Sequence, residues 1–228
     1  MKKSIIIDFD HTIGFFEQII FLINIIEVTY DKPLTMLEMC NIFEYYPYIF
    51  RPKLFDIILL ILYFQKDNQI SFFILYTRNT KPEFVNSIIS FLEKKVNYAP
   101  LFNYTLYEKT KEKNIKTIIE SVKEDNINNH LLCFIDNILY SYKNNHLEIK
   151  YIKCEDYVHY YDNKELIQLF PYHIFSKINK QLLKTYFDNM KYSKKYKKQK
   201  KIRSLPYYMY ELNSSFIIQC IRDFINIS

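Results

Sequence analysis

Three short apolar runs constrain the fold of this chain more than any other feature of the sequence. Each run is rich in Ile, Leu or Phe and ends in polar residues, and segments with helical periodicity separate the runs. The runs are residues 4–10 (SIIIDFD), 70–77 (ISFFILYT) and 131–137 (LLCFIDN). Continuous apolar strands that alternate with helices are typical of a parallel sheet covered on both faces. The pattern therefore predicts an α/β fold with a Rossmann-like, doubly wound parallel sheet.

The segments around these runs indicate how the chain is organised. Residues 13–50 form a small, mostly helical insert after the first strand, and a strongly periodic apolar face over residues 54–62 predicts a further helix. After about residue 180 the alternation stops, and one helix, a lysine-rich run and a closing amphipathic helix over residues 216–225 follow. We therefore expect one domain over residues 1–180 and a helical, basic C-terminal extension over residues 181–228. A chain cut near residue 185 should then keep the activity of the first domain.

The positive charge of the chain is concentrated in that extension. The formal net charge is +6, and residues 191–203 (KYSKKYKKQKKIR) contain lysines and an arginine but no acid. The rest of the chain is therefore close to neutral. The run is either a solvated segment or a contact surface for nucleic acid, a nuclear-targeting element or a docking site for an acidic partner.

Composition also excludes several classes of protein. The chain has a single glycine, Gly14, so it cannot form a glycine-rich phosphate-binding loop, and this glycine stands where the chain must turn away from the first strand. Its four cysteines are far apart and form no zinc-binding pattern. The longest apolar stretch, residues 54–64, is shorter than the roughly 20 residues of a membrane span, and no signal peptide is evident. We expect an intracellular protein of the cytoplasm or nucleus without a membrane partner.

Polar side chains follow each of the three predicted strands. They are Asp8, Asp10 and Thr12 after the first, Thr77 after the second, and Asp136 and Asn137 after the third. Ligands of open α/β sheets bind outside the carboxyl ends of the strands, so these groups should meet in one crevice. Carboxylates that converge there repel one another unless a cation is present, and Mg²⁺ prefers oxygen ligands of this kind. The residues alone thus predict Mg²⁺-dependent phosphoryl chemistry.

At these positions the chain resembles the haloacid dehalogenase-like phosphatase superfamily. Residues 5–13 (IIIDFDHTI) match its DxDx(T/V) motif, residues 72–77 (FFILYT) its strand that ends in Thr or Ser, and residues 131–137 its acidic strand end. Within the superfamily, the chain is most similar to the small C-terminal-domain phosphatases, also called the NLI-interacting-factor-like group. Arg51-Pro52, Asp136-Asn137 and residues 162–171 carry that closer similarity. The chain departs from the group at His11 and at residues 138–139, where the group usually has Glu and Ser-Pro.

The resemblance implies a role for each polar residue at the strand ends. Asp8 would be the nucleophile and form an aspartyl-phosphate, and Asp10 would act as general acid and then as general base. Mg²⁺ would be held by Asp8, Asp136 and Asp10, the last through its backbone carbonyl. Thr77 would donate a hydrogen bond to the phosphoryl group. The supporting residues would be Thr12, Asn137 and Arg51.

The family also uses a lysine that balances the charge of the acids and the phosphate. We choose Lys116, because it lies at the start of the predicted helix before the third strand, and Lys113 is the second candidate. Each residue also has a purely structural interpretation. Arg51 would be an ion-pair partner, His11 a partly exposed loop residue, and Asp136-Asn137 a turn.

The predicted function is hydrolysis of phosphate monoesters, with phosphoserine or phosphothreonine in a protein or peptide as the substrate. One alternative keeps the chemistry but takes a nucleotide or the phosphorylated end of a nucleic acid, with the insert over residues 13–50 as a small cap. Another is an inactive relative that binds its partners through the basic run at residues 191–203. The acids at all three strand ends argue against the inactive alternative.

Overall fold

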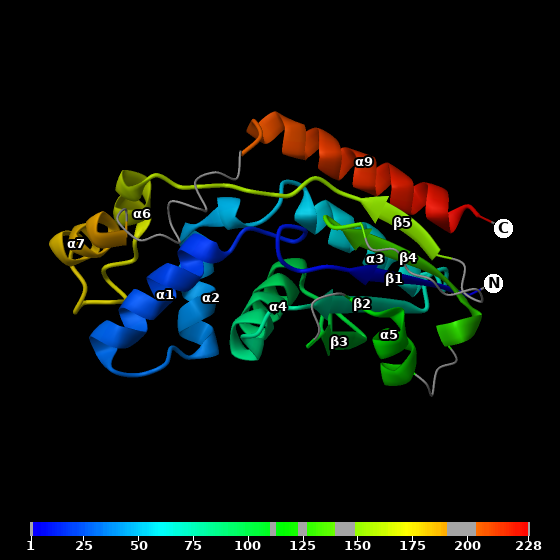
Figure 1. Cartoon of the computed structure of the whole chain (residues 1–228), viewed down its shortest axis with the longest axis horizontal. Coiled ribbons are helices and arrows are strands. Elements are labelled where there is room, and N and C mark those ends of the chain that lie inside the picture. Colours follow the sequence, from blue (N-terminus) through cyan, green and yellow to red (C-terminus); the bar gives the residue numbers. More distant parts are fainter. Residues whose placement is uncertain (1, 110–112, 123–126, 140–148, 191–203, 228) are drawn as a thin grey trace.

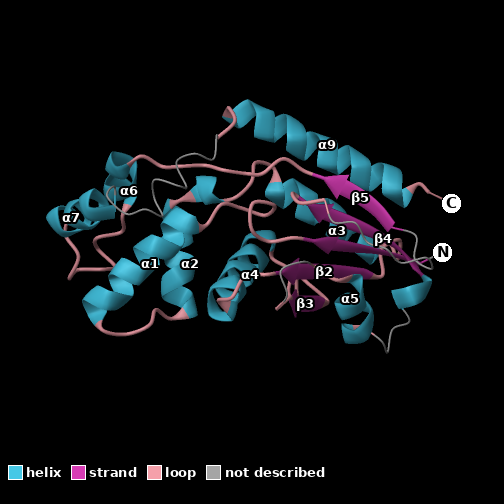
Figure 2. Ribbon diagram, in the orientation of Figure 1, coloured by secondary structure: helices cyan, strands magenta, loops and turns pink. Residues whose placement is uncertain are grey.

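The computed structural model describes residues 2–109, 113–122, 127–139, 149–190 and 204–227. Its centre is a five-stranded sheet in which every pair of neighbouring strands is parallel, with the order β3-β2-β1-β4-β5 (Figures 1 and 2). The strands are β1 (Lys2–Ile7), β2 (Phe72–Thr77), β3 (Tyr104–Tyr107), β4 (His130–Asp136) and β5 (Ile149–Lys153). This architecture confirms the predicted Rossmann-like parallel sheet. The three apolar runs form its three central strands.

Helices occupy the connections from β1 to β2, from β2 to β3 and from β3 to β4, and further helices follow β5. After β1 come α1 (Glu17–Tyr30), α2 (Met36–Tyr45), the short η1 (Pro47–Ile49) and α3 (Leu54–Lys66). The later helices are α4 (Pro82–Val96), α5 (Ile115–Ser121), η3 (Ile127–Asn129), α6 (Asn163–Leu169), α7 (Lys180–Met190) and α9 (Tyr207–Ile225). No helix within these described residues is long and apolar enough to cross a membrane.

Alternate residues of β1 face two separate hydrophobic cores. Ile5 and Ile7 belong to the larger core, together with buried residues of α1, α2, α3, α4, α7 and α9. Ile6 belongs to the smaller core, which contains Tyr76 of β2 and Ile118 of α5. Because successive side chains of a strand point to opposite faces, the two cores lie on opposite sides of the sheet. Helices therefore cover both faces.

The insert after β1 contributes to a helical layer beyond the carboxyl ends of the strands. Figure 1 shows α1, α2, α6 and α7 gathered at this end of the molecule. Thr35 begins α2 with a capping box, in which its hydroxyl accepts from the backbone N–H of Glu38 and the Glu38 carboxylate accepts from that of Thr35. The rings of Phe21 in α1 and Phe187 in α7 lie 5.9 Å apart, which links the insert to the C-terminal part of the chain.

The residues after 180 pack against the rest of the chain. Ile217, Ile221 and Phe224 of α9 belong to the same hydrophobic core as β1, and α9 lies along α3 (Figure 1). The Nζ atom of Lys3 donates to the backbone oxygens of Ile225 and Ile227 at 2.7 and 2.6 Å. Helix α9 therefore shares a core with the expected first domain, and the boundary at residue 180 stays a prediction. The lysine-rich run at residues 191–203 lies outside the described residues.

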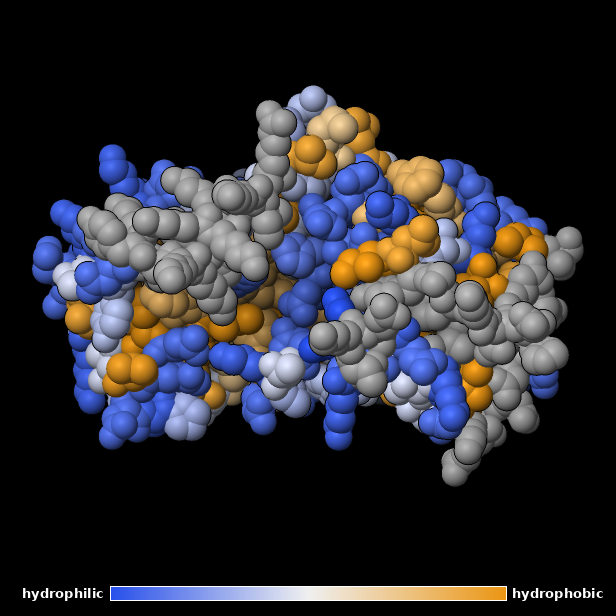
Figure 3. Space-filling view, viewed as in Figure 1, coloured by the Kyte–Doolittle hydropathy of each residue, from blue (hydrophilic) through white to orange (hydrophobic). Residues whose placement is uncertain are grey.

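Helix α9 begins at Tyr207, well before the expected start at residue 216. Tyr210 and Ser214 are buried and extend the inward-facing stripe of the helix toward its N-terminus, with the spacing of three and four residues that one helix face requires. The outer face of α9 carries the exposed side chains of Leu212 and Phe216. Figure 3 shows patches of hydrophobic surface at the upper edge of the molecule, where Figure 1 places α9. Apolar residues on both faces obscured the start of this helix in the sequence.

Candidate active site

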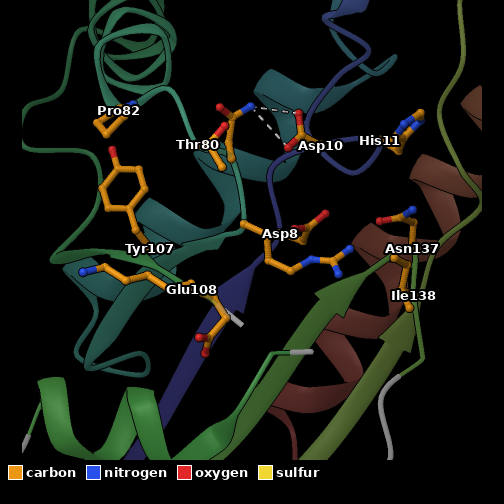
Figure 4. A pocket seen from close by; sticks show the side chains of 12 residues that line it. Asp8, Asp10, His11, Thr80, Pro82, Tyr107, Glu108, Asn137 and Ile138 are labelled. Atoms are coloured by element: carbon orange, nitrogen blue, oxygen red, sulfur yellow. Dashed lines mark hydrogen bonds between the residues drawn. The ribbon is translucent and has the colours of Figure 1, made fainter. Parts of the chain in front are cut away.

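The carboxyl ends of β1 and β4 bring two of the predicted acids together. Asp8 directly follows β1, and its backbone N–H donates to the oxygen of Ile135, next to Asp136, the last residue of β4. Asp8 lines a cavity of about 750 Å³, together with Asp10, Asn79 and Asn137 (Figure 4). The structure thus places the predicted site residues Asp8, Asp10 and Asn137 at one edge of the sheet, as the strand pattern implied, together with Asn79, which was not predicted.

A buried lysine joins the two acids. The Nζ atom of Lys113 donates to Asp8 Oδ1 and, at 2.7 Å, to Asp136 Oδ2, and only 2% of the lysine side chain is exposed. Burial alone would lower the pKa of Lys113, but the charges and hydrogen bonds of the two carboxylates outweigh it and hold the pKa above its usual range. Burial and repulsion from Asp8 raise the pKa of Asp136, against the opposing effect of Lys113.

The structure does not place Lys116, the residue chosen for this position, against the two acids. Its side chain is 75% exposed and pairs with Glu120 one turn along α5, at 3.7 Å. Asn114 caps α5 by accepting from the backbone N–H of Lys116, so Lys116 lies in the first turn of the helix. Lys113 precedes the cap and lies at the edge where the strands end. An Asn before a helical segment is a capping signal, and it could have separated the two lysines in the sequence.

Asp10 lies apart from this ion pair but within the same cavity. Its two carboxylate oxygens each accept from Nδ2 of Asn79 at 3.3 Å, as the dashed lines in Figure 4 show. Burial, reinforced by repulsion from Asp8, raises the pKa of Asp10 to about 6, while the hydrogen bond from Asn79 opposes the rise. A carboxyl group with this pKa is protonated in part of the molecules near neutral pH.

The contact from Asn79 is one that the sequence analysis missed. Thr77 ends β2 with a fully buried side chain, and its hydroxyl accepts from the backbone N–H of Asn79 at 2.9 Å. The Asn79 carbonyl oxygen Oδ1 accepts in turn from the N–H of Lys81. Asn often forms such a local turn, so an Asn two residues after the strand end was a usable signal. Thr77 therefore holds the loop that carries Asn79, and its contact with a phosphoryl group stays a prediction.

Thr12 and Asn137 lock the two acid-bearing loops together. The hydroxyl of Thr12 donates to Asn137 Oδ1 at 3.1 Å and accepts from the backbone N–H of Asn137 at 3.2 Å. Asn137 also donates from Nδ2 to Asp156 at 2.8 Å. Both residues are buried. The geometry fits the supporting role that was expected of them.

Arg51 is buried behind the loop that follows Asp10, with only 2% of the residue exposed. Its guanidinium donates to the backbone oxygens of Thr12, His11 and Glu155 at 2.6, 3.0 and 2.6 Å, and to Asn213 Oδ1 of α9 at 2.9 Å. These neutral acceptors replace the carboxylate that an ion pair would need. Arg51 thus joins the site loop, the segment after β5 and α9.

The turn after Asp10 depends on His11 and Gly14. His11 adopts a left-handed conformation with φ of 61°, and its backbone N–H donates to Gly14 O at 2.8 Å. His11 is half-buried and lines the cavity, in keeping with a partly exposed loop residue. Gly14 itself does not have a positive φ, so the expected conformational reason for a glycine is wrong. Space is the reason, since a Cβ atom at this position would lie 2.4 Å from the backbone oxygen of Ile49.

The donor chemistry of the cavity bears on the predicted Mg²⁺ site. In the part of the chain that the structure describes, no three side chains of His, Cys, Asp or Glu gather as they would around a metal ion. The expected set is smaller, with the carboxylates of Asp8 and Asp136 and one backbone oxygen. The two carboxylates repel each other and already share the ammonium group of Lys113. One or two carboxylates are the protein ligands that Mg²⁺ prefers, since it keeps several waters. The residues present therefore fit Mg²⁺.

Comparisons of the chain with protein-family models, with curated proteins and with solved structures found no match. The similarity to the haloacid dehalogenase-like phosphatases therefore rests on the motifs in the sequence.

Proposed function

We propose that the chain is a Mg²⁺-dependent phosphatase of the haloacid dehalogenase-like type, with Asp8 as the nucleophile. The observation that carries this proposal is the group formed by Asp8, Asp136 and Lys113 at the carboxyl ends of two neighbouring parallel strands. The half-buried Asp10, two residues further on, lines the same cavity. The order and spacing of the sequence motifs lend the proposal further support.

Lys113 leaves Asp8 able to attack. It engages Oδ1, and within the described residues no hydrogen bond occupies Oδ2 of Asp8. Oδ2 would attack the phosphorus atom and form an aspartyl-phosphate while the bond to the leaving oxygen breaks. The positive charge of Lys113 would offset the negative charge of the phosphoryl group. Mg²⁺, when bound, would neutralise further charge on that group.

Asp10 would move the proton in both steps. Its raised pKa, about 6, allows the protonated carboxyl group to protonate the leaving oxygen near neutral pH. The resulting carboxylate would then take a proton from the water that attacks the aspartyl-phosphate, which restores Asp8 and releases phosphate. Asn79 would orient Asp10 for both transfers through its two hydrogen bonds at 3.3 Å.

The substrate that we propose is a phosphoserine or phosphothreonine side chain of a protein or peptide. The closer resemblance to the small C-terminal-domain phosphatases supports this class. The cavity of about 750 Å³ has room for the residues that flank a phosphorylated side chain. A panel of phosphopeptides and nucleotides tests the choice, and a strong preference for nucleotides would remove it.

A comparison of two Asp→Asn variants tests the catalytic part of the proposal. Asp8→Asn should lower Mg²⁺-dependent hydrolysis of an aryl phosphate by at least about a thousandfold, because no other group replaces the nucleophile. Asp67→Asn is the matched control, since Asp67 is exposed at the end of α3 and lies outside the cavity. Circular dichroism should show the same fold for both variants. Turnover by Asp8→Asn at the wild-type rate would refute the proposal.

A further inference from the structure

The cavity contains a buried acid for which the proposed mechanism has no use. Glu108 directly follows β3, and its backbone N–H donates to Thr77 O at 2.8 Å, which continues the pairing with β2. Its side chain is buried, and Figure 4 shows the carboxylate pointing away from Asp8. Glu108 is therefore placed to bind other residues of the chain rather than a phosphoryl group.

Two hydroxyl groups donate to one oxygen of Glu108. The Tyr76 hydroxyl donates to Oε2 at 2.5 Å, and that of Thr117, in the first turn of α5, donates to the same oxygen at 3.0 Å. Charge-assisted hydrogen bonds of this kind are stronger than those between neutral groups. The carboxylate thus ties the end of β2 to α5.

Tyr76 also contacts the backbone next to Lys113. Its hydroxyl oxygen accepts from the N–H of Asn114 at 2.8 Å, and the centre of its ring lies 5.4 Å from the Nζ atom of Lys113. Tyr76 precedes Thr77 in β2, so it points to the face of the sheet that α5 covers. One side chain therefore supports both the ammonium group of Lys113 and the residue that follows it.

We propose that Tyr76 and Glu108 are positioning residues that hold Lys113 against Asp8 and Asp136. The expected effect on turnover rests on the proposed phosphatase function. The expected effect on the position of Lys113 does not depend on activity. Lys113 lies just before α5. The hydrogen bond from Thr117 to Glu108 and the one from the N–H of Asn114 to Tyr76 fix where that helix begins. A shift of about 1 Å at a site of this kind can lower a rate by about a hundredfold.

Four variants separate positioning from other roles. Tyr76→Phe keeps the ring beside Lys113 but removes the hydroxyl, and Thr117→Val removes a single donor to Glu108. Glu108→Ala removes the shared acceptor, whereas Glu108→Gln keeps an oxygen that can accept both bonds. The matched control is Tyr46→Phe, because the buried Tyr46 hydroxyl donates to Leu166 O, far along the chain from this network.

The first measurement is the reactivity of Lys113 toward a brief pulse of reductive methylation, read by peptide mass spectrometry. The exposed Lys116 serves as the internal reference in the same region. We expect the Lys113-to-Lys116 labelling ratio to rise at least tenfold in Tyr76→Phe and Glu108→Ala, and less in Thr117→Val. The ratio should stay at the wild-type value in Glu108→Gln and Tyr46→Phe. If Glu108→Ala does not fold, Tyr76→Phe and Thr117→Val still decide the question.

The second measurement is steady-state hydrolysis of an aryl phosphate with Mg²⁺. Tyr76→Phe should lower kcat about tenfold or more with little change in KM, and Glu108→Gln should stay within about threefold of wild type. Unchanged labelling in Tyr76→Phe and Glu108→Ala would overturn the inference, as would equal losses of kcat in Glu108→Gln and Glu108→Ala. If the variants label as predicted but the wild-type protein shows no turnover, the positioning of Lys113 would be upheld and the proposed function refuted.

Discussion

Replacement of Asp10 by Asn should make the folded protein more stable at neutral pH while it removes activity. Asp10 is isosteric with Asn, and an Asn side chain can still accept the hydrogen bond from Asn79. The substitution therefore removes chiefly a negative charge that burial and Asp8 disfavour. A site that holds such a charge for catalysis does so at a cost in stability.

The size of the effect follows from the pKa of Asp10. The carboxyl group has a pKa of 3.8 in an unperturbed chain and about 6 in the folded protein. Each unit corresponds to 1.36 kcal/mol, so the ionised group destabilises the fold by about 3 kcal/mol above pH 6. The folded state binds the proton more tightly, so wild-type stability falls as pH rises from 3.8 through 6. The stability of Asp10→Asn should not fall over this pH range, because the variant has no carboxyl group to ionise at this position.

Urea unfolding in the presence of EDTA, followed by circular dichroism between pH 4 and pH 8, measures the difference. We expect Asp10→Asn to be more stable than wild type by under about 1 kcal/mol at pH 4 and by about 3 kcal/mol at pH 8. The exposed Asp67→Asn variant should show no comparable gain with pH. A difference that stays flat, or a variant less stable than wild type at pH 8, would refute the reasoning.

Three further perturbations test the packing around the site. Arg51→Met should lower the unfolding free energy by about 3–5 kcal/mol in urea, because it leaves buried backbone oxygens without donors; a loss under 1 kcal/mol would contradict the role of Arg51. Gly14→Ala should cost about 1–3 kcal/mol, since its Cβ would overlap Ile49 O, and an unchanged urea midpoint would count against that contact. Deletion of residues 204–228 should abolish cooperative unfolding, because α9 completes the core over α3. A truncated chain that still unfolds in a sharp transition would instead support residues 181–228 as an independent extension.

The parts of the fold that the sequence could predict are those that repeat a strong local pattern. The apolar runs before Asp8, Thr77 and Asp136 identified three strands, and a parallel sheet places their ends at a common edge. The sequence predicted that Thr12 and Asn137 are supporting residues, but not that they bond to each other. Its hydrogen bonds depend on the exact approach of two loops, which no local pattern encodes.

The errors come from contacts between segments that lie far apart in the chain. Lys113 and Lys116 are three residues apart, and only the helix cap at Asn114 decides which of them reaches the acids. Arg51 was interpreted as a supporting residue of the site or as an ion-pair partner. Its partners include backbone oxygens that become available when distant segments meet. The role of α9 was hidden for the same reason, since its buried stripe has a partner only once α3 lies on the sheet.

The most direct test of the central claim is to trap the aspartyl-phosphate. The protein would be mixed with an aryl phosphate and Mg²⁺, quenched in acid during turnover, and analysed by peptide mass spectrometry. The account predicts one phosphoryl group on Asp8, sensitive to hydroxylamine as acyl phosphates are, and absent from Asp8→Asn. Turnover with a phosphoryl group on another residue, or turnover that persists in Asp8→Asn, would contradict it.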